Sequence, residues 1–80
     1  MLIRIKTFAV LKNYFKEDFE INLEDHSSIA DAIQHLERLN PNSVNILSHC
    51  LTAIEEEMAD KFTKLKAGQI LYLLPPVSGG

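Results

Sequence analysis

Alternating apolar and polar residues predict strands near both ends of the chain. In LIRIKTF, residues 2–8, Ile3 and Ile5 point to one side while the residues between them point to the other. FEINL, at 19–23, alternates in the same way. A period of two with β-branched residues is typical of half-buried strands, so these segments are predicted to form a hairpin. ILYLL, at 70–74, is apolar throughout, which favours a central strand with a parallel neighbour.

Between these strands the spacing of apolar residues changes to that of a helix. Ser28 is followed three residues later by Asp31, which matches a capping box and predicts the start of the helix. Asn40 and Pro41 predict its end and the start of a short second helical segment, since Asn caps helices and Pro is tolerated at the first helical position. The stripe predicted to face the sheet comprises Ile29, Ala32, Ile33, Leu36 and Leu39.

The order of elements predicts a two-layer α+β domain, in which one helix covers one face of a sheet and leaves the other face partly open. A short strand is expected from Leu51, followed by a tight turn or a solvated edge at Glu55–Glu57. Gly68 is expected to take a positive φ in the turn before the last strand. We therefore expect a folded domain over residues 1–74 and a flexible carboxyl-terminal tail over residues 75–80.

Composition limits the classes of function. The chain has 80 residues, which allows one small core, and its 46% hydrophobic and 24% charged residues are typical of a folded domain. A formal net charge of −3 argues against a nucleic-acid partner. No apolar run is long enough to cross a bilayer, so no membrane association is expected. Cys50 is the only cysteine, which excludes an internal disulfide and fits a reducing, cytoplasmic location.

The last six residues, PPVSGG, carry the candidate chemistry. Pro75 and Pro76 cannot donate hydrogen bonds to a sheet and favour an extended conformation, so they are predicted to project the tail from the body. Gly79 and Gly80 have no side chains and could thread a narrow slot. The Gly80 carboxylate would need activation, for example as an acyl-adenylate, before a sulfur or nitrogen nucleophile attacks it. A frayed end is the alternative interpretation.

The cysteine, the histidines and the acidic stretch are expected to have structural and not catalytic roles. Cys50 is expected to be a buried thiol on the apolar side of a helix, and a persulfide relay is the alternative. The spacing of the three histidines, at positions 26, 35 and 49, is unlike that of metal ligands. Glu55–Glu57 is expected to be a solvated turn, with an acidic patch that attracts a basic partner as the alternative.

The placement of PPVSGG directly after an apolar strand resembles the small subunit of molybdopterin synthase. Phe8-Ala9 after the first strand and the capped helix after Ser28 extend this resemblance over the whole chain. That family belongs to the ubiquitin-like β-grasp sulfur carriers. The resemblance implies a mixed sheet of four to five strands packed against one main helix and a short helical segment.

The resemblance also implies a function. A ubiquitin-activating type of enzyme, using ATP and magnesium, would adenylate Gly80, and sulfur would convert it to a thiocarboxylate. The tail, Pro75, Pro76, Val77, Ser78 and Gly79, would insert into the large synthase subunit and deliver sulfur to cyclic pyranopterin monophosphate. The complex would be a heterotetramer in which this chain has no active site of its own. No cofactor or metal would be bound permanently.

Alternation and the family's contact positions both predict that Phe8, Met58 and Leu74 form an apolar docking patch beside the tail. The alternative is that these are ordinary core or scattered surface residues. Three other functions stay open: a carrier for thiazole or another sulfurated product, a protein modifier conjugated through Gly80, and an interaction domain with an inert tail.

Overall fold

Five strands form one mixed sheet in the computed structural model, which describes residues 1–76. They are β1 (Leu2–Thr7), β2 (Asp18–Asn22), β3 (Leu51–Ile54), β4 (Glu57–Met58) and β5 (Ile70–Leu74). The order across the sheet is β2-β1-β5-β3-β4. β5 is therefore central, parallel to β1 and antiparallel to β3, and β1 and β2 form the predicted hairpin. The predicted position of the last strand and its parallel neighbour are confirmed.

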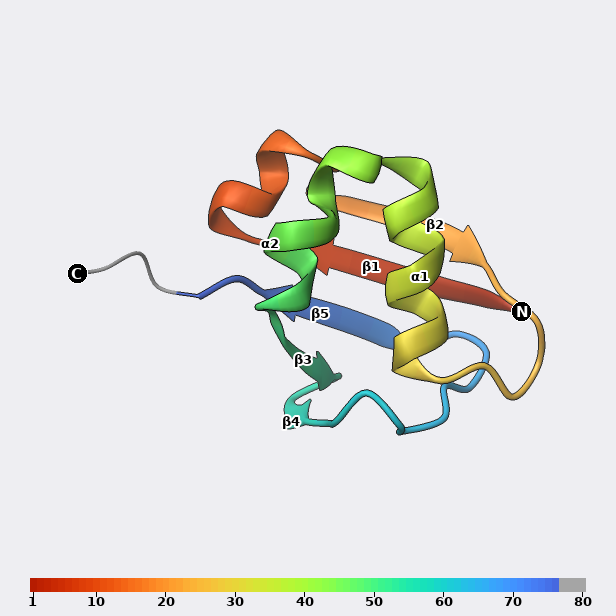
Figure 1. Cartoon of the computed structure of the whole chain (residues 1–80). Helices are drawn as coiled ribbons and strands as arrows, with labels where there is room; N and C mark the ends of the chain where they lie inside the picture. The colour runs from red at the N-terminus through yellow and green to blue at the C-terminus, as the bar shows by residue number, and fades with distance from the viewer. Residues whose placement is uncertain (77–80) are drawn as a thin grey trace.

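Helices cover one face of this sheet (Figure 1). They are η1 (Ala9–Asn13), α1 (Ile29–Leu39), η2 (Pro41–Ser43) and α2 (Val44–Ser48). The predicted capping box is present, because the Asp31 backbone N–H donates to Ser28 Oγ at 3.3 Å and the Ser28 N–H donates to Asp31 Oδ2 at 2.8 Å. Asn40 caps η2 through its side-chain oxygen. None of the helices within residues 1–76 is both long and apolar enough to span a bilayer.

The core lies between α1 and the sheet. Ile5 on β1 and Leu71 and Leu73 on β5 are fully buried, as is Leu36 on α1. Leu39 was predicted to belong to the helix stripe, but it is 59% exposed. At 3.6 residues per turn this position lies about 70° from the middle of the stripe, and α1 ends there, so the stripe stops at Leu36.

The turns near the amino end of β5 agree only in part with the prediction from the sequence. Gly68 has the predicted positive φ, 84°. Glu55 also has a positive φ, 55°, in the two-residue turn that joins β3 to β4. The acidic stretch was predicted to be a tight turn or a solvated edge, and it contains both: Glu55 and Glu56 form the turn, and Glu57 is the first residue of the edge strand β4, because it pairs with Ile54. The sheet therefore extends one strand further than the clear period-two signals suggest.

Candidate functional site

The predicted tail begins where the central strand ends. β5 stops at Leu74, directly before Pro75, which is half-buried, and Pro76, which is exposed. β1 and β5 run in the same direction, and the carboxyl-terminal segment leaves from the end at which both strands finish (Figure 1). The remaining predicted tail residues, Val77, Ser78, Gly79 and Gly80, lie outside the described part of the chain. The residues around this end of β5 form the surface from which the carboxyl-terminal segment continues.

The face of the sheet opposite α1 is apolar near this end. Strand pairing joins Leu74 to Leu51, Tyr72 to Ala53, and Ala53 to Met58. Residues paired across neighbouring strands project from the same face of a sheet. Leu51, Met58, Tyr72 and Leu74 therefore share one face, whereas Leu71 and Leu73 point to the core beneath α1.

Phe8 extends this surface beyond the end of β1. Its ring stacks on that of Tyr72 with the centroids 6.0 Å apart and the planes inclined by 27°. Lys6 is the β1 residue that pairs with Tyr72, and its ammonium lies 6.0 Å from the centre of the same ring. Ala9, directly after Phe8, has a φ of 52° and begins η1, so the chain turns away at this point. We call Phe8, Leu51, Met58, Tyr72 and Leu74 the open-face patch.

The open-face patch contains all three residues predicted to dock a partner. Leu51 and Met58 are 62% and 61% exposed and Phe8 is 39% exposed, while Tyr72 and Leu74 are half-buried. Contiguous apolar surface of this kind is typical of interaction sites. The binding role of Phe8, Met58 and Leu74 stays a prediction, but the structure brings them onto one face of the sheet.

Sequence reasoning missed two members of the patch. Tyr72 lies two residues before Leu74 on β5, so strand alternation alone could have found it. Leu51 could not have been found in this way, because its place depends on its pairing with Leu74.

Charged residues occupy the other half of the open face. Arg4 on β1 donates to Asp18 on β2 through two bonds, Nε to Oδ1 at 2.8 Å and Nη2 to Oδ2 at 2.6 Å. The hydrogen bond from Arg4 lowers the pKa of the Asp18 carboxyl below its usual value. Arg4 and Asp18 therefore neutralise each other in this half of the open face.

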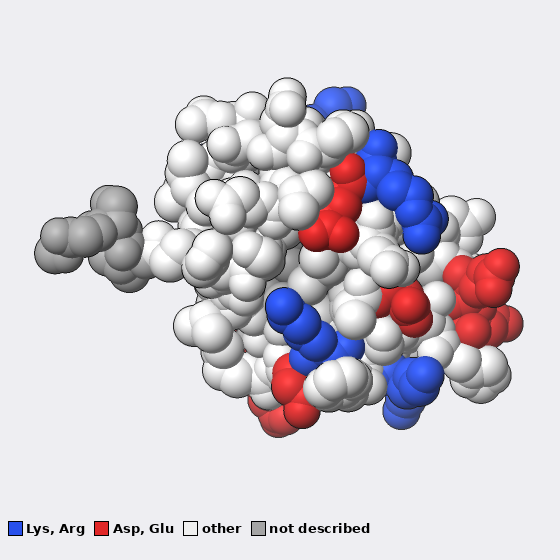
Figure 2. Space-filling view, in the orientation of Figure 1, with Lys and Arg blue, Asp and Glu red and all other residues white. Residues whose placement is uncertain are grey.

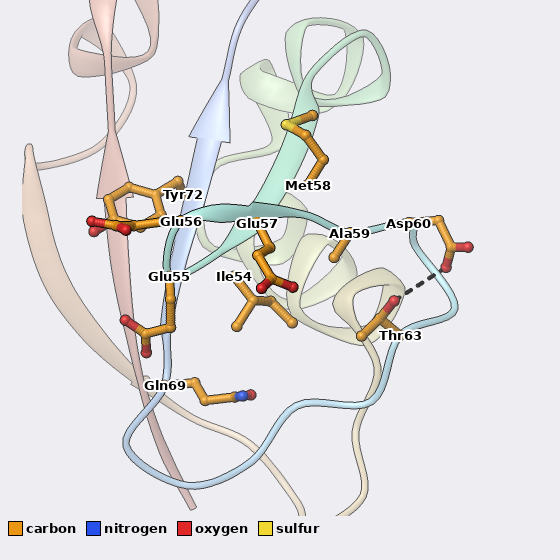
Figure 3. Close-up of a pocket in the computed structure, with 10 residues that line it drawn as sticks. All are labelled: Ile54, Glu55, Glu56, Glu57, Met58, Ala59, Asp60, Thr63, Gln69 and Tyr72. Atoms are coloured by element: carbon orange, nitrogen blue, oxygen red, sulfur yellow. Dashed lines mark hydrogen bonds between the residues drawn. The ribbon is translucent and has the colours of Figure 1, made fainter.

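A hollow of about 790 Å³ lies at the amino end of β5, against the β3–β4 turn (Figure 3). We call it the acidic pocket; it is lined by Ile54, Glu55, Glu56, Glu57, Met58, Ala59, Asp60, Thr63, Gln69 and Tyr72. Two of its carboxylates are held by hydrogen bonds: Glu55 Oε1 accepts from the Ile70 N–H at 3.2 Å, and Asp60 Oδ1 accepts from the Phe62 N–H at 2.9 Å. Met58 and Tyr72 belong to both the pocket and the open-face patch.

Charged side chains are also unevenly distributed on the helix-covered side. Figure 2 shows a mostly uncharged surface over the half of the molecule from which the carboxyl-terminal segment leaves, and Lys, Arg, Asp and Glu gathered on the other half. The surroundings of the tail are therefore poor in charge on this side of the sheet as well.

Cys50 is a structural thiol. It is 7% exposed, and its Sγ donates to the Ile46 carbonyl at 3.3 Å. Burial raises the pKa of the Cys50 thiol, so little nucleophilic thiolate forms at neutral pH. The prediction of a buried thiol is confirmed, although Cys50 lies two residues beyond the end of α2 and is not part of a helix. Within residues 1–76 no three His, Cys, Asp or Glu side chains are placed to hold a metal ion.

Comparison with solved structures identifies the fold. SAMP1, a small archaeal modifier protein from Haloferax volcanii, superimposes with a TM-score of 0.87 at 24% identity, covering 100% of both chains. A putative molybdopterin converting factor subunit 1 from Pyrococcus furiosus gives 0.86 at 18% identity, covering 95% of this chain and 98% of that one. These likenesses show the ubiquitin-like β-grasp fold.

A third structure is more similar in sequence. It is the complex of subunits 1 and 2 of the molybdopterin-converting factor from Helicobacter pylori, with 27% identity, a TM-score of 0.71 and coverage of 100% of both chains. No curated protein matches the chain. The ThiS family matches residues 5–80, nearly the whole sequence. The chain therefore belongs to the ThiS family and is a ubiquitin-like sulfur carrier of the kind that includes the molybdopterin synthase small subunits.

Proposed function

We propose that the protein is the sulfur carrier subunit of a molybdopterin synthase. The observation that carries the proposal is the position of PPVSGG directly after β5, the central strand of a ThiS-family domain. The similarity to a chain in the Helicobacter pylori converting-factor complex supports the molybdopterin branch over other sulfurated products. That complex also supports a second subunit as the partner of this chain.

The chemistry takes place at Gly80. Its carboxylate oxygen attacks the α-phosphate of ATP, with magnesium, in an adenylating enzyme, and pyrophosphate leaves. A persulfide sulfur then attacks the acyl carbon and expels AMP, and a thiol cleaves the resulting S–S bond to leave the thiocarboxylate. The thiocarboxylate donates its sulfur to cyclic pyranopterin monophosphate in the large subunit, and the carrier is used again for the second sulfur of the dithiolene.

The body of the domain supplies recognition. The open-face patch lies beside the start of the tail, because Leu74 belongs to the patch, ends β5 and directly precedes Pro75. A partner that covers this patch would therefore hold the tail at a fixed point next to its own active site. Fixing the tail in this way lowers the entropic cost of bringing Gly80 to the acceptor. The ATP, the magnesium ion and the catalytic side chains all belong to the partners.

Intact-mass spectrometry tests this function. The protein is incubated with its adenylating enzyme, ATP and a sulfur source, and a mass gain equal to the exchange of one oxygen for sulfur is expected. Deletion of Gly80 should abolish the gain while the far-UV circular dichroism spectrum stays unchanged, because Gly80 lies beyond the sheet. The thiocarboxylated protein should then form molybdopterin with the large subunit and cyclic pyranopterin monophosphate.

Other outcomes would identify a different function. Sulfur transfer to a thiazole precursor but not to the pterin would place the protein in a sibling pathway with the same carrier chemistry. Attachment of Gly80 to lysines of other proteins would identify a protein modifier. A protein that is never adenylated would contradict the proposal.

A further inference from the structure

The acidic pocket adjoins the open-face patch, so one partner can cover both. Met58 and Tyr72 line the pocket and belong to the patch. Along β5, the pocket begins at Gln69 and the patch ends at Leu74, a separation of about 17 Å at about 3.3 Å per residue. A standard protein interface covers about 800 Å² on each partner, which is wide enough to include both ends.

The pocket is negatively charged, and the cation that the structure places next to its lining is Lys6, whose ammonium lies 6.0 Å from the centre of the Tyr72 ring. Four carboxylates line it, and within residues 1–76 no Lys or Arg does. The ion pairs of the described chain use other acids, namely Asp25, Asp18 and Glu17. Like charges gathered in a hollow repel one another and concentrate the field there, so a cation that enters the hollow is attracted and relieves the repulsion.

Two of the four carboxylates are left for a ligand outside the chain. Glu55 is bonded to the Ile70 N–H, and Asp60 to the Phe62 N–H and Thr63 Oγ1. The side-chain carboxylates of Glu56 and Glu57 accept no hydrogen bond from the part of the chain that the structure describes, residues 1–76, whereas those of Glu55 and Asp60 do. Figure 3 shows Glu56 in the β3–β4 turn and Glu57 at the start of β4, and both line the same pocket as Tyr72. Carboxylates that have no partner among the described residues suit the lysine or arginine of a binding protein, which can pair with them, while the Tyr72 ring of the pocket already has Lys6 beside it.

We propose that the open face receives a protein partner that carries a lysine or arginine beside an apolar surface, and that this basic side chain enters the acidic pocket while the apolar surface covers the open-face patch. The charged half of the open face is not expected to bind this basic side chain, since Arg4 and Asp18 neutralise each other there. The inference rests on the proposed function, because it assumes that a partner covers the open-face patch. It adds the chemistry by which the carrier selects that partner and fixes its orientation.

The test measures binding of the full-length protein to the synthase large subunit and to the adenylating enzyme by calorimetry, at low and at high sodium chloride. The double variant Glu56→Gln/Glu57→Gln removes two charges without disturbing the bonds of Glu55 and Asp60. For at least one of the two partners, its Kd at low salt should be about 3- to 10-fold weaker than that of the wild type, as expected for two exposed ion pairs. Its dependence on salt for that partner should also be shallower than that of the wild type.

The matched control is Glu24→Gln/Glu37→Gln, which changes the net charge equally but alters the loop before α1 and α1 itself. It should bind both partners within about twofold of the wild type, because it lies away from the open face. Equal binding of the wild type and Glu56→Gln/Glu57→Gln to both partners would overturn this inference and leave the proposed function intact. Weakening by both double variants alike would also overturn it, by showing an effect of net charge alone. Wild-type protein that binds neither enzyme would contradict the proposed function as well.

Discussion

The two faces of the sheet are built from the same strands but differ in what covers them. Beneath α1, Ile5 and Leu71 have no exposed surface, whereas Leu51 and Met58 on the opposite face are 62% and 61% exposed. Both faces are apolar near the centre of the sheet, so the two faces do not differ in the type of residue that they carry there. The difference shows that the covered face stabilises the domain, because burying apolar surface lowers the free energy only where something covers it. The exposed face is the one that we propose for recognition.

Neighbouring leucines on β5 give the largest expected difference between the faces. Leu73→Ala removes a fully buried side chain and should lower the free energy of unfolding by about 2–5 kcal/mol. Leu74→Ala removes a half-buried side chain from the open-face patch and should cost about 1 kcal/mol. Urea denaturation followed by circular dichroism measures both. Equal losses would show that the two faces contribute alike to stability.

Phe8→Asp tests the open face by binding and not by stability, since it should weaken partner binding and leave the domain folded. A charge in the open-face patch should weaken binding to the large subunit by about 2 kcal/mol or more, which is about 30-fold in Kd. The control is Leu39→Asp, a substitution at a residue of α1 that is 59% exposed on the covered side. Calorimetry should show normal binding for Leu39→Asp, and unfolding curves should show both variants folded. Unchanged binding by Phe8→Asp would remove the patch from the docking surface.

A smaller effect is expected at the start of α1, which supports the covered face. Ser28→Ala removes the side-chain cap of α1 and should lower the free energy of unfolding by about 1 kcal/mol, with no change in partner binding. Thermal denaturation and calorimetry measure the two quantities. A change in binding would mean that the two faces are coupled through α1.

The pH dependence of the same cap supplies its control. Hydrogen bonds from the Ser28 N–H and Oγ lower the pKa of the Asp31 carboxyl. A carboxyl with a lowered pKa stabilises the fold fully above its unfolded value of about 3.9, and this contribution is lost as the pH falls through the lower, folded value. Wild type should therefore exceed Asp31→Asn in stability at neutral pH, and the gap should close in strong acid. A gap that is independent of pH would contradict the role of the charge.

Most of the fold could be predicted because its signals are local. The alternation around Ile3 and Ile5, the Ser28 cap and the apolar run of β5 each act within a few residues. β4 escaped prediction as a strand because its two residues are too few to show a period. The prediction that Leu39 belongs to the buried stripe was wrong for a different reason: the helical spacing of apolar residues continues to this position, but α1 ends there.

The candidate site was predicted only in part because it depends on which strands lie side by side. Phe8 and Leu74 follow from alternation. Leu51 and the acidic pocket do not, since they require the register of β3 on β5 and the packing of the loop that returns from β4. Glu55 shows the same limit, because its positive φ and its bond to Ile70 have no local signal in the sequence.

The parallel pairing of β1 with β5 joins residues that are more than sixty positions apart, such as Thr7 and Leu73. A ladder of that span closes only when almost the whole chain is in place, and the amides within it are expected to exchange with solvent mainly through global unfolding. The strand that precedes the proposed reactive tail, β5, is thus expected to open only when the whole domain unfolds. If the tail acts as proposed, unfolding of the domain would remove β5 as its anchor and the ability to present the tail to a partner in one step.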